Sequence, residues 1–299
     1  MYPYIENIAL CCTLAACGTT GVSGPASPAQ SALTSATATN QPASEPSGGP
    51  ASEVTRTLIA REDDAAMPGF ESRIYLIEYP PGVAAQLHAH TEQTVGYVLE
   101  GRFESGFGNA PVTVTRAGEG FVETPHEPHR FRNPDGTRPL RFVVAGAFHK
   151  DEPLIQPLPG ATGFASAPER TSSASTDAVL QVPGSSEERV TEVRRTLLAQ
   201  KGIPDLPGLE SRMYLVEFPP GAESKVHVHA AQGIGYVVEG TFESSFGDGP
   251  VTVKRAGDGF VDTPGKPHHF RNPDSARPLR FVFAGTFHKD EPTFQVVAQ

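Results

Sequence analysis

Six histidines in two matching sets are the residues of this chain best suited to chemistry. Each set holds a His-x-His pair and a later third histidine: His88, His90 and His129, then His227, His229 and His268. Alternate side chains of an extended strand share a face, about 6.5–7 Å apart along the backbone, so the two rings of each pair can converge on one ion. Neutral imidazole suits Zn, Fe, Ni or Cu better than Mg or Ca. Each pair therefore indicates a candidate metal site, although a single His-x-His pair is more often polar residues on a solvent-facing strand.

The two sets belong to an internal duplication. Segment 81–101 returns as 220–240, and segment 118–133 returns as 257–272, always with an offset of 139 positions. A period of this length predicts tandem domains, because the repeats of a solenoid run to only about 20–50 residues. A recent duplication preserves every residue alike, so the repetition does not by itself show which residues are functional.

Composition narrows the class of partner. The chain has 299 residues, a formal net charge of −10 at pH 7 and a pI near 5.5, and it contains no cluster of Lys or Arg. This charge argues against nucleic acid as a partner and favours a small molecule. The three cysteines, Cys11, Cys12 and Cys17, all precede the first repeat. Neither repeat can therefore hold a disulfide or a thiolate metal site.

The N-terminus resembles a bacterial lipoprotein signal. An apolar run over 8–16 ends in Leu14-Ala15-Ala16-Cys17, which is similar to a lipobox. The run is too short to span a bilayer, which needs about 20 apolar residues, and fits the core of a signal peptide. The resemblance implies cleavage after residue 16, a lipid on Cys17 and a protein of the cell envelope that faces the periplasm, touching the membrane through the lipid anchor only. The alternative is a cytoplasmic protein with a frayed N-terminus.

Composition also divides the chain into segments. After the predicted signal peptide, 1–17, residues 18–52 are nearly all Gly, Ser, Thr, Ala and Pro, which predicts a disordered tether. A second stretch of this kind, 154–188, predicts a flexible linker. The two domains are then expected at 53–153 and 189–299.

Each repeat has the pattern of an all-β domain. Short segments rich in Val, Ile, Tyr and Phe are bounded by Gly and Pro, and no stretch of helix length has a period of 3.6 residues. In the first repeat strands are predicted at 72–79, 95–101, 111–118, 120–125 and 139–148. Regularly spaced short strands of this kind indicate a sandwich or a barrel.

The motifs resemble those of the cupin superfamily. The first cupin motif places a glycine, a His-x-His pair and a second glycine at fixed spacing, and here these are Gly82, His88, His90 and Gly101. The second motif is matched by Gly118, His129 and Asn133. Both motifs recur in the second copy. The resemblance implies two tandem jelly-roll barrels, a bicupin. It also implies that His129 joins His88 and His90 on one divalent transition metal, of Fe, Zn, Ni, Mn or Cu, and that His268 does so with His227 and His229.

The glutamate of the first cupin motif is absent. Thr94 and Gly233 stand at its position, and neither can supply a carboxylate. Glu123 and Asp262, six residues before the third histidine of each set, are candidates for the missing ligand or for an acid/base. They could equally be hydrogen-bonded or exposed acids at a strand end. The adjoining Gln93 and Gln232 are expected to point the other way by strand parity.

Two classes of function remain open. The leading hypothesis is a metal-binding bicupin of the cell envelope that transforms a small polar molecule by oxygenase, isomerase or lyase chemistry, with open metal positions for the substrate. The alternative is a non-catalytic periplasmic bicupin that binds or senses a small molecule. Either protein could assemble as a homo-oligomer.

Overall fold

The computed structural model describes residues 53–107, 111–159 and 192–297. These residues form strands and connecting turns, with no helix among them. No helix long and apolar enough to cross a membrane occurs in this part of the chain. Cys17, the predicted lipidation site, and the signal peptide and tether lie outside the described residues.

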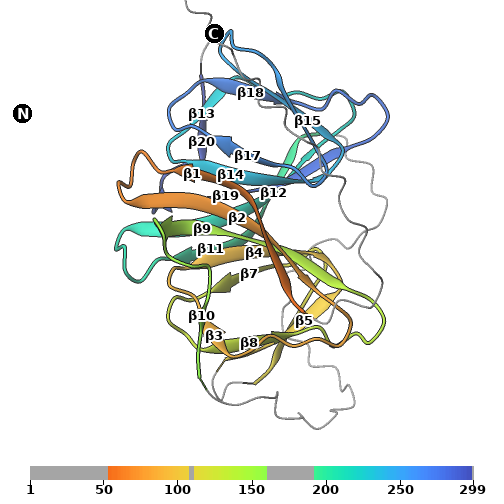
Figure 1. The fold of residues 1–299 in the computed structure, drawn as a ribbon. Coiled ribbons are helices and arrows are strands. Elements are labelled where there is room, and N and C mark those ends of the chain that lie inside the picture. Colours follow the sequence, from red (N-terminus) through yellow and green to blue (C-terminus); the bar gives the residue numbers. More distant parts are fainter. Residues whose placement is uncertain (1–52, 108–110, 160–191, 298–299) are drawn as a thin grey trace, which may run out of the picture. The chain divides into compact units, whose positions relative to one another are not determined.

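The first barrel is built from two five-stranded antiparallel sheets (Figure 1). One sheet has the order β1-β2-β9-β4-β7, and its strands are Thr55–Asp63, Phe70–Tyr79, Leu140–His149, Thr94–Glu100 and Gly120–Glu123. The other has the order β10-β3-β8-β5-β6, with Gln156–Pro157, His88–Ala89, His129–Arg132, Arg102–Phe107 and Thr113–Arg116.

The second barrel repeats this arrangement. Its first sheet has the order β11-β12-β19-β14-β17, with Arg194–Gly202, Leu209–Phe218, Leu279–His288, Gly233–Glu239 and Gly259–Asp262. Its second sheet has the order β16-β15-β18-β13-β20, with Thr252–Arg255, Thr241–Phe246, His268–Arg271, His227–His229 and Phe294–Val296. The prediction of an all-β fold with two tandem jelly-roll barrels is confirmed.

Phenylalanine rings fill the space between the two sheets of each barrel. In the first barrel the fully buried rings include Phe103, Phe142 and Phe148, and in the second they include Phe242, Phe281 and Phe287. Burying a ring of this size removes a large apolar area from water, which contributes roughly 1.5–3 kcal/mol for each side chain. Alternation along the strands, with one face apolar, directs these rings inward.

The first barrel continues past residue 153, where the linker was predicted to begin. Leu154 is buried in the barrel core, and β10 pairs with β3, placing Gln156 opposite Ala89 and Pro157 opposite His88. The segment is rich in Pro and polar residues, which is why composition alone suggested a linker. Its closing strand covers the edge of the sheet that carries His88.

Glycine fixes the tight turn between the fourth and fifth strands of each barrel. Gly101 and Gly240 have φ values of 79° and 85°. A β-carbon there would approach the carbonyl oxygens of Pro139 and Pro278 to 2.8 and 2.5 Å. Only glycine adopts this backbone conformation without strain. The last glycine of the first cupin-like motif therefore has a conformational role.

Candidate metal centres

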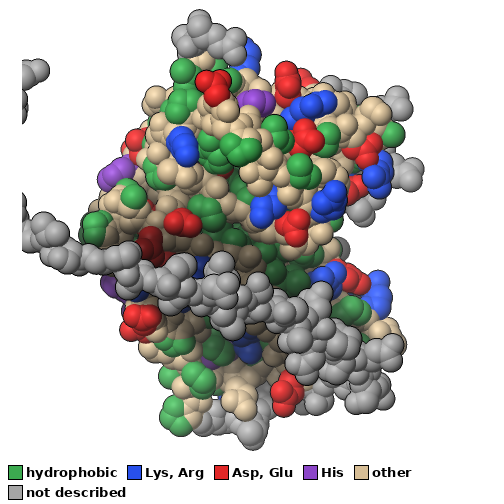
Figure 2. Space-filling model, turned by 45° about the horizontal axis from the view of Figure 1, so that its top comes forward, with side chains coloured by type: hydrophobic (Ala, Val, Ile, Leu, Met, Phe, Trp, Pro, Cys, Tyr) green, Lys and Arg blue, Asp and Glu red, His purple; other side chains and the backbone are tan. Residues whose placement is uncertain are grey.

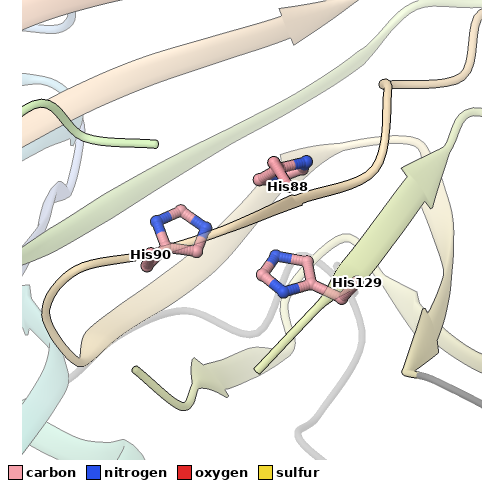
Figure 3. Close-up of side chains that lie close together, drawn as sticks. All are labelled: His88, His90 and His129. Carbon is pink, nitrogen blue, oxygen red and sulfur yellow. The ribbon is translucent and has the colours of Figure 1, made fainter. Parts of the chain in front are cut away.

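Three histidines converge inside the first barrel. His88 and His90 lie on and just beyond β3, and β8 contributes His129, whose backbone is paired with that of His88. One ring nitrogen from each residue lies within 4.8 Å of those of the others, and the three rings face a common space (Figure 3). All three side chains are buried, with His129 fully inaccessible.

Backbone carbonyls fix the tautomer of each ring. Nδ1 of His88 lies 2.7 Å from the carbonyl oxygen of Gln86, and Nδ1 of His90 and of His129 lie 2.8 Å from the carbonyls of Leu154 and Glu127. A carbonyl can only accept a hydrogen bond, so each Nδ1 carries the hydrogen. In the neutral ring Nε2 then keeps its lone pair, and the Nε2 atoms are the available metal ligands.

The second barrel repeats this arrangement. The ligand nitrogens of His227, His229 and His268 also lie within 4.8 Å of one another. Their Nδ1 atoms donate to the carbonyls of Lys225, Thr293 and Lys266 at 2.8, 2.9 and 2.8 Å. Both clusters therefore present three preoriented Nε2 atoms.

The free nitrogens are buried without hydrogen-bond partners. Within the described residues this holds for Nε2 of His90, His129, His229 and His268. Burial lowers the pKa of His88 and His268 to about 4 and that of His229 to about 3. These three rings are thus neutral at pH 7, with lone pairs directed into a dehydrated space. A buried unsatisfied polar atom is costly, and a bound cation would satisfy it, so the donor set fits a transition metal.

Glu123 occupies the place left by the missing motif glutamate. It lies directly opposite Thr94 across the β4–β7 pair, so its carboxylate reaches the cluster from the neighbouring strand. Its Oε1 is 3.1 Å from Nε2 of His90 and 3.3 Å from Nε2 of His129. Burial raises the pKa of this carboxyl, but the positive charge and hydrogen bonds of His90 and His129 in their protonated forms outweigh burial and hold the pKa well below its usual range. Burial lowers the pKa of His129, but the carboxylate of Glu123 outweighs burial and raises it. The acid is therefore ionised and able to act as a fourth ligand.

Thr94 orients that carboxylate. Its hydroxyl donates a hydrogen bond to the other oxygen of Glu123, Oε2. The residue that stands at the glutamate position of the family motif thus holds the substituting glutamate in place. The sequence shows only that Thr94 replaces the motif glutamate. The role of its hydroxyl cannot be predicted until the residue opposite it on the neighbouring strand is known.

Asp262 occupies the corresponding position in the second barrel, without such support. It lies opposite Gly233, which has no hydroxyl. Its Oδ2 is 3.6 Å from Nε2 of His229 and 3.9 Å from Nε2 of His268, and it has no hydrogen-bond partner among the described residues. Burial raises the pKa of this carboxyl to about 8. The two candidate metal centres therefore differ in their acid.

The cavities beside the two clusters also differ. A cavity of about 210 Å³ in the second barrel is lined by His227 and His229. The equivalent space in the first barrel, which touches His88, His90 and Glu123, measures about 20 Å³. The cavity of the second barrel is large enough for an organic molecule, whereas the space in the first barrel has room for about one water.

The glutamines next to the vacated position point away from the metal centres, as strand parity predicts. Nε2 of Gln93 donates to the carbonyl of Lys201 at 2.9 Å, and Nε2 of Gln232 donates to the carbonyl of Glu62 at 3.0 Å. Each bond links one barrel to the first strand of the other. The same interface contains a cluster of buried apolar residues from both barrels, among them Ile74 and Met213.

The chain matches known proteins over both barrels. The family model described as "Cupin domain" matches residues 75–146 and 214–285. A cupin-domain-containing oxidoreductase, srdB, of Neurospora crassa is 33% identical over 69 residues, which are 23% of this chain and 35% of that protein. The match thus spans about a third of that curated relative.

Solved structures of Bacillus subtilis oxalate decarboxylase share the fold. One, from a study of that enzyme's Mn(II) centres, matches with a TM-score of 0.50 and 16% identity, over 84% of this chain and 81% of the other. A point mutant of the same enzyme matches over the same shares with a TM-score of 0.51 and 16% identity. At this identity the likeness concerns the fold. The described part of this chain therefore contains two tandem barrels, each of which is matched by the cupin-domain model and holds a three-histidine cluster.

Proposed function

We propose that this protein is a bicupin of the cell envelope that depends on a divalent transition metal and transforms a small polar molecule. The observation that carries the proposal is the state of the six imidazoles. In both barrels every Nδ1 is committed to a backbone carbonyl, and the Nε2 atoms converge without protein partners that would use their lone pairs. Rings that are oriented in this way, with their Nε2 lone pairs available, are suited to bind a cation.

The residues of each centre have distinct tasks. His88, His90 and His129 would hold the ion in the first barrel, with Glu123 as the fourth ligand and Thr94 keeping that carboxylate in place. His227, His229 and His268 would do so in the second, with Asp262 as the nearest acid. A bound ion with open positions supplies Lewis-acid or redox chemistry. The aromatic walls of the barrel exclude water from the same space.

The reaction class is proposed from the chemistry of the centre together with the known relatives. Oxidoreductase and decarboxylase chemistry are both compatible with a buried ion held by three neutral ligands and one acid, and they are the activities named for the Neurospora crassa and Bacillus subtilis proteins. The metal is one of Fe, Zn, Ni, Mn and Cu.

The small cavity of the first barrel favours a non-catalytic role for that centre. Its space of about 20 Å³ admits no organic substrate. The first centre is therefore assigned a structural role. Both catalysis and the alternative function, a bicupin that only binds or senses a small molecule, are assigned to the second barrel, whose cavity measures about 210 Å³.

Metal analysis tests the metal centres. Purified untagged protein should contain about two transition-metal ions per chain, one for each cluster. His90→Ala and His229→Ala should each reduce the content to about one, and the double variant should reduce it to nearly zero. His149→Ala serves as the matched control, because His149 lies outside both clusters and is largely exposed. A double variant that keeps the parent's metal content would contradict the proposal.

Activity separates an enzyme from a binding protein. Oxygen uptake and loss of substrate, followed across a panel of small polar acids, should appear in the parent and disappear after chelation and in His229→Ala. Turnover that survives both treatments would exclude the metal-dependent reaction.

The envelope location rests on the lipobox-like segment that ends in Cys17. Full-length protein expressed in a bacterium should incorporate labelled palmitate and sediment with membranes. Cys17→Ser should abolish both. Equal labelling of the two proteins would contradict a lipid anchor at this residue.

A further inference from the structure

The second barrel contains a cavity whose lining combines apolar and aromatic side chains with two histidines and one arginine. Its walls are apolar and aromatic, made by Tyr214, Val216, Phe270, Phe281, Phe283 and Phe294. Two metal-centre histidines, His227 and His229, line one part of it, and the guanidinium-bearing side chain of Arg195 contributes a cation to its lining. The proposed function assigns metal binding to the two histidines and no role to Arg195.

The volume of the cavity sets the size of its occupant. An engineered apolar cavity of about 150 Å³ holds benzene, and a water molecule occupies about 30 Å³ in the liquid. At about 210 Å³ the cavity of the second barrel has room for a six-membered ring that carries one further small group.

Particular substitutions between the copies account for part of the difference from the first barrel. Thr293 replaces Leu154, and Val216 replaces Ile77, among the residues that line the two spaces. Each replacement has one heavy atom fewer. Other lining positions carry the larger residue in the second barrel, Phe283 for Val144 and Phe294 for Ile155, so the cavity depends on how these rings are placed and not on smaller side chains alone.

Arg195 is held in place without an anionic partner. Its guanidinium carbon lies 4.3 Å from the centroid of the Phe294 ring. In the part of the chain that the structure describes, no carboxylate lies within 4.0 Å of this guanidinium, whereas the preceding residue, Arg194, reaches Glu217 at 4.0 Å. An exposed arginine that is stacked on an aromatic ring and has no carboxylate partner in the protein is suited to bind a carboxylate through two parallel hydrogen bonds.

Arg195 lines the same cavity as His227 and His229, and the Phe294 ring that it stacks on also lies against the ring of His227, with 5.5 Å between the ring centroids. The equivalent residue of the first barrel, Arg56, also lines its space, but Ile155 stands where Phe294 would stack. The first barrel therefore lacks both the volume and the aromatic support.

We propose that the second barrel binds a small monocarboxylate with an apolar body about the size of a benzene ring. Arg195 pairs with the carboxylate, the aromatic walls contact the body, and the bound molecule lies beside His227 and His229. This substrate class rests on the proposed function, in which the bound carboxylic acid reacts at the metal centre. Binding through Arg195 is measured independently of turnover.

The test uses 4-fluorobenzoate as the probe, with 4-fluorobenzyl alcohol as its uncharged analogue. Binding to the full chain is followed by fluorine NMR and calorimetry. The parent should bind about one benzoate per chain and bind the alcohol at least tenfold more weakly. Arg195→Gln should weaken benzoate binding at least tenfold, since the change removes the positive charge and the two parallel donors that pair with the carboxylate.

Matched variants locate the site. Arg56→Gln, the same change at the equivalent position of the first barrel, should leave benzoate binding unchanged. Thr293→Leu, which installs the residue of the first barrel, should weaken binding by filling the cavity. Arg195→Lys keeps the charge without the planar fork and should restore part of the affinity, which makes loss of folding in Arg195→Gln distinguishable from loss of the ion pair.

The outcomes separate the two proposals. Equal binding by the parent and Arg195→Gln, equal losses in Arg56→Gln and Arg195→Gln, or equal affinity for the acid and the alcohol would each overturn the inference. Metal content is measured on the same samples. Metal-loaded protein that fails to bind benzoate overturns the inference alone, whereas Arg195-dependent binding by protein that cannot be loaded with metal supports the pocket and overturns the metal-dependent function.

Discussion

The ring of Phe283 fills the space that a side chain at Gly233 would need. A β-carbon on Gly233 would lie 2.0 Å from Cζ of Phe283, far inside contact distance. In the first barrel the same two positions hold Thr94 and Val144. In the second barrel the first of these positions therefore holds the smaller residue and the second holds the larger one. The second barrel also has no hydroxyl at the position where Thr94 supports the acid of the candidate metal centre.

This exchange predicts strong coupling between the two positions. Gly233→Thr alone should lower the free energy of unfolding by about 1–3 kcal/mol, because the new side chain clashes with the Phe283 ring. Adding Phe283→Val should recover much of that loss by restoring the pair found in the first barrel. Urea unfolding of the parent, both single variants and the double variant measures the coupling. Effects that add to within about 0.5 kcal/mol would show that the two residues are independent.

Thr94 should control metal affinity in the first barrel through Glu123. Thr94→Val removes the hydroxyl that donates to Glu123 Oε2 and should weaken metal binding there by about 10–100-fold, the usual effect of losing a partner that orients a ligand. Chelator competition measures the affinity in a His229→Ala background, which leaves only the first centre. Thr94→Ser keeps the hydroxyl and should retain the affinity. Equal affinities of the valine and serine variants would rule out this role.

Asn133 should be essential to the stability of the first barrel. It is fully buried, and its amide nitrogen donates to the carbonyls of Pro80 at 3.1 Å and Arg138 at 2.8 Å, joining the end of β2 to the turn before β9. Asn133→Ala should cost about 1–3 kcal/mol, because buried carbonyls lose their donor. Chemical unfolding measures the loss, and Asn272→Ala should reproduce it in the second barrel. A change within error at both positions would be inconsistent with this contribution.

Asp274 should make stability depend on acid pH. Hydrogen bonds from the backbone N–H groups of Ala276 and Arg277 hold the pKa of its carboxyl below the ordinary value of 3.8. A lowered folded-state pKa contributes stability that is fully present above pH 3.8 and is lost as the pH falls through the folded-state pKa. Asp274→Asn should therefore melt at a lower temperature than the parent at pH 7, and this difference should shrink toward zero in acid. A difference that stays constant with pH would exclude the ionised carboxylate as its source.

The sequence predicts the fold of each repeat well because its signals are local. Alternation along 72–79 and 139–148 matches β2 and β9, and the glycines at 101 and 240 mark turns that only this residue tolerates. Local patterns are weaker where pairing over long distances decides the structure. The two-residue strand β3, which carries His88, has no pattern of its own and exists because β8 and β10 pair with it on either side.

The acid of each candidate metal centre also depends on contacts that the local sequence does not predict. The sequence offers Glu123 and Asp262 as candidates and equally allows both to be surface acids. Only the pairing of β4 with β7 places Glu123 opposite Thr94 and beside His90. Arg195 was not singled out at all, because its neighbour Arg194 is identical in type, and register alone decides which of the two lines the cavity.

The amino-acid sequence by itself determines the duplication, the β class and the six histidines, since these depend on residue identity, spacing and alternation along the chain. The tertiary structure decides which atoms of those histidines are free, which acid joins them and which barrel has room for a ligand. The physical reason is that carbonyl partners, cross-strand neighbours and cavity volume arise from residues far apart in sequence. A difference of one to three heavy atoms at such contacts, as between Thr293 and Leu154 or between Gly233 and Thr94, distinguishes the second barrel from the first.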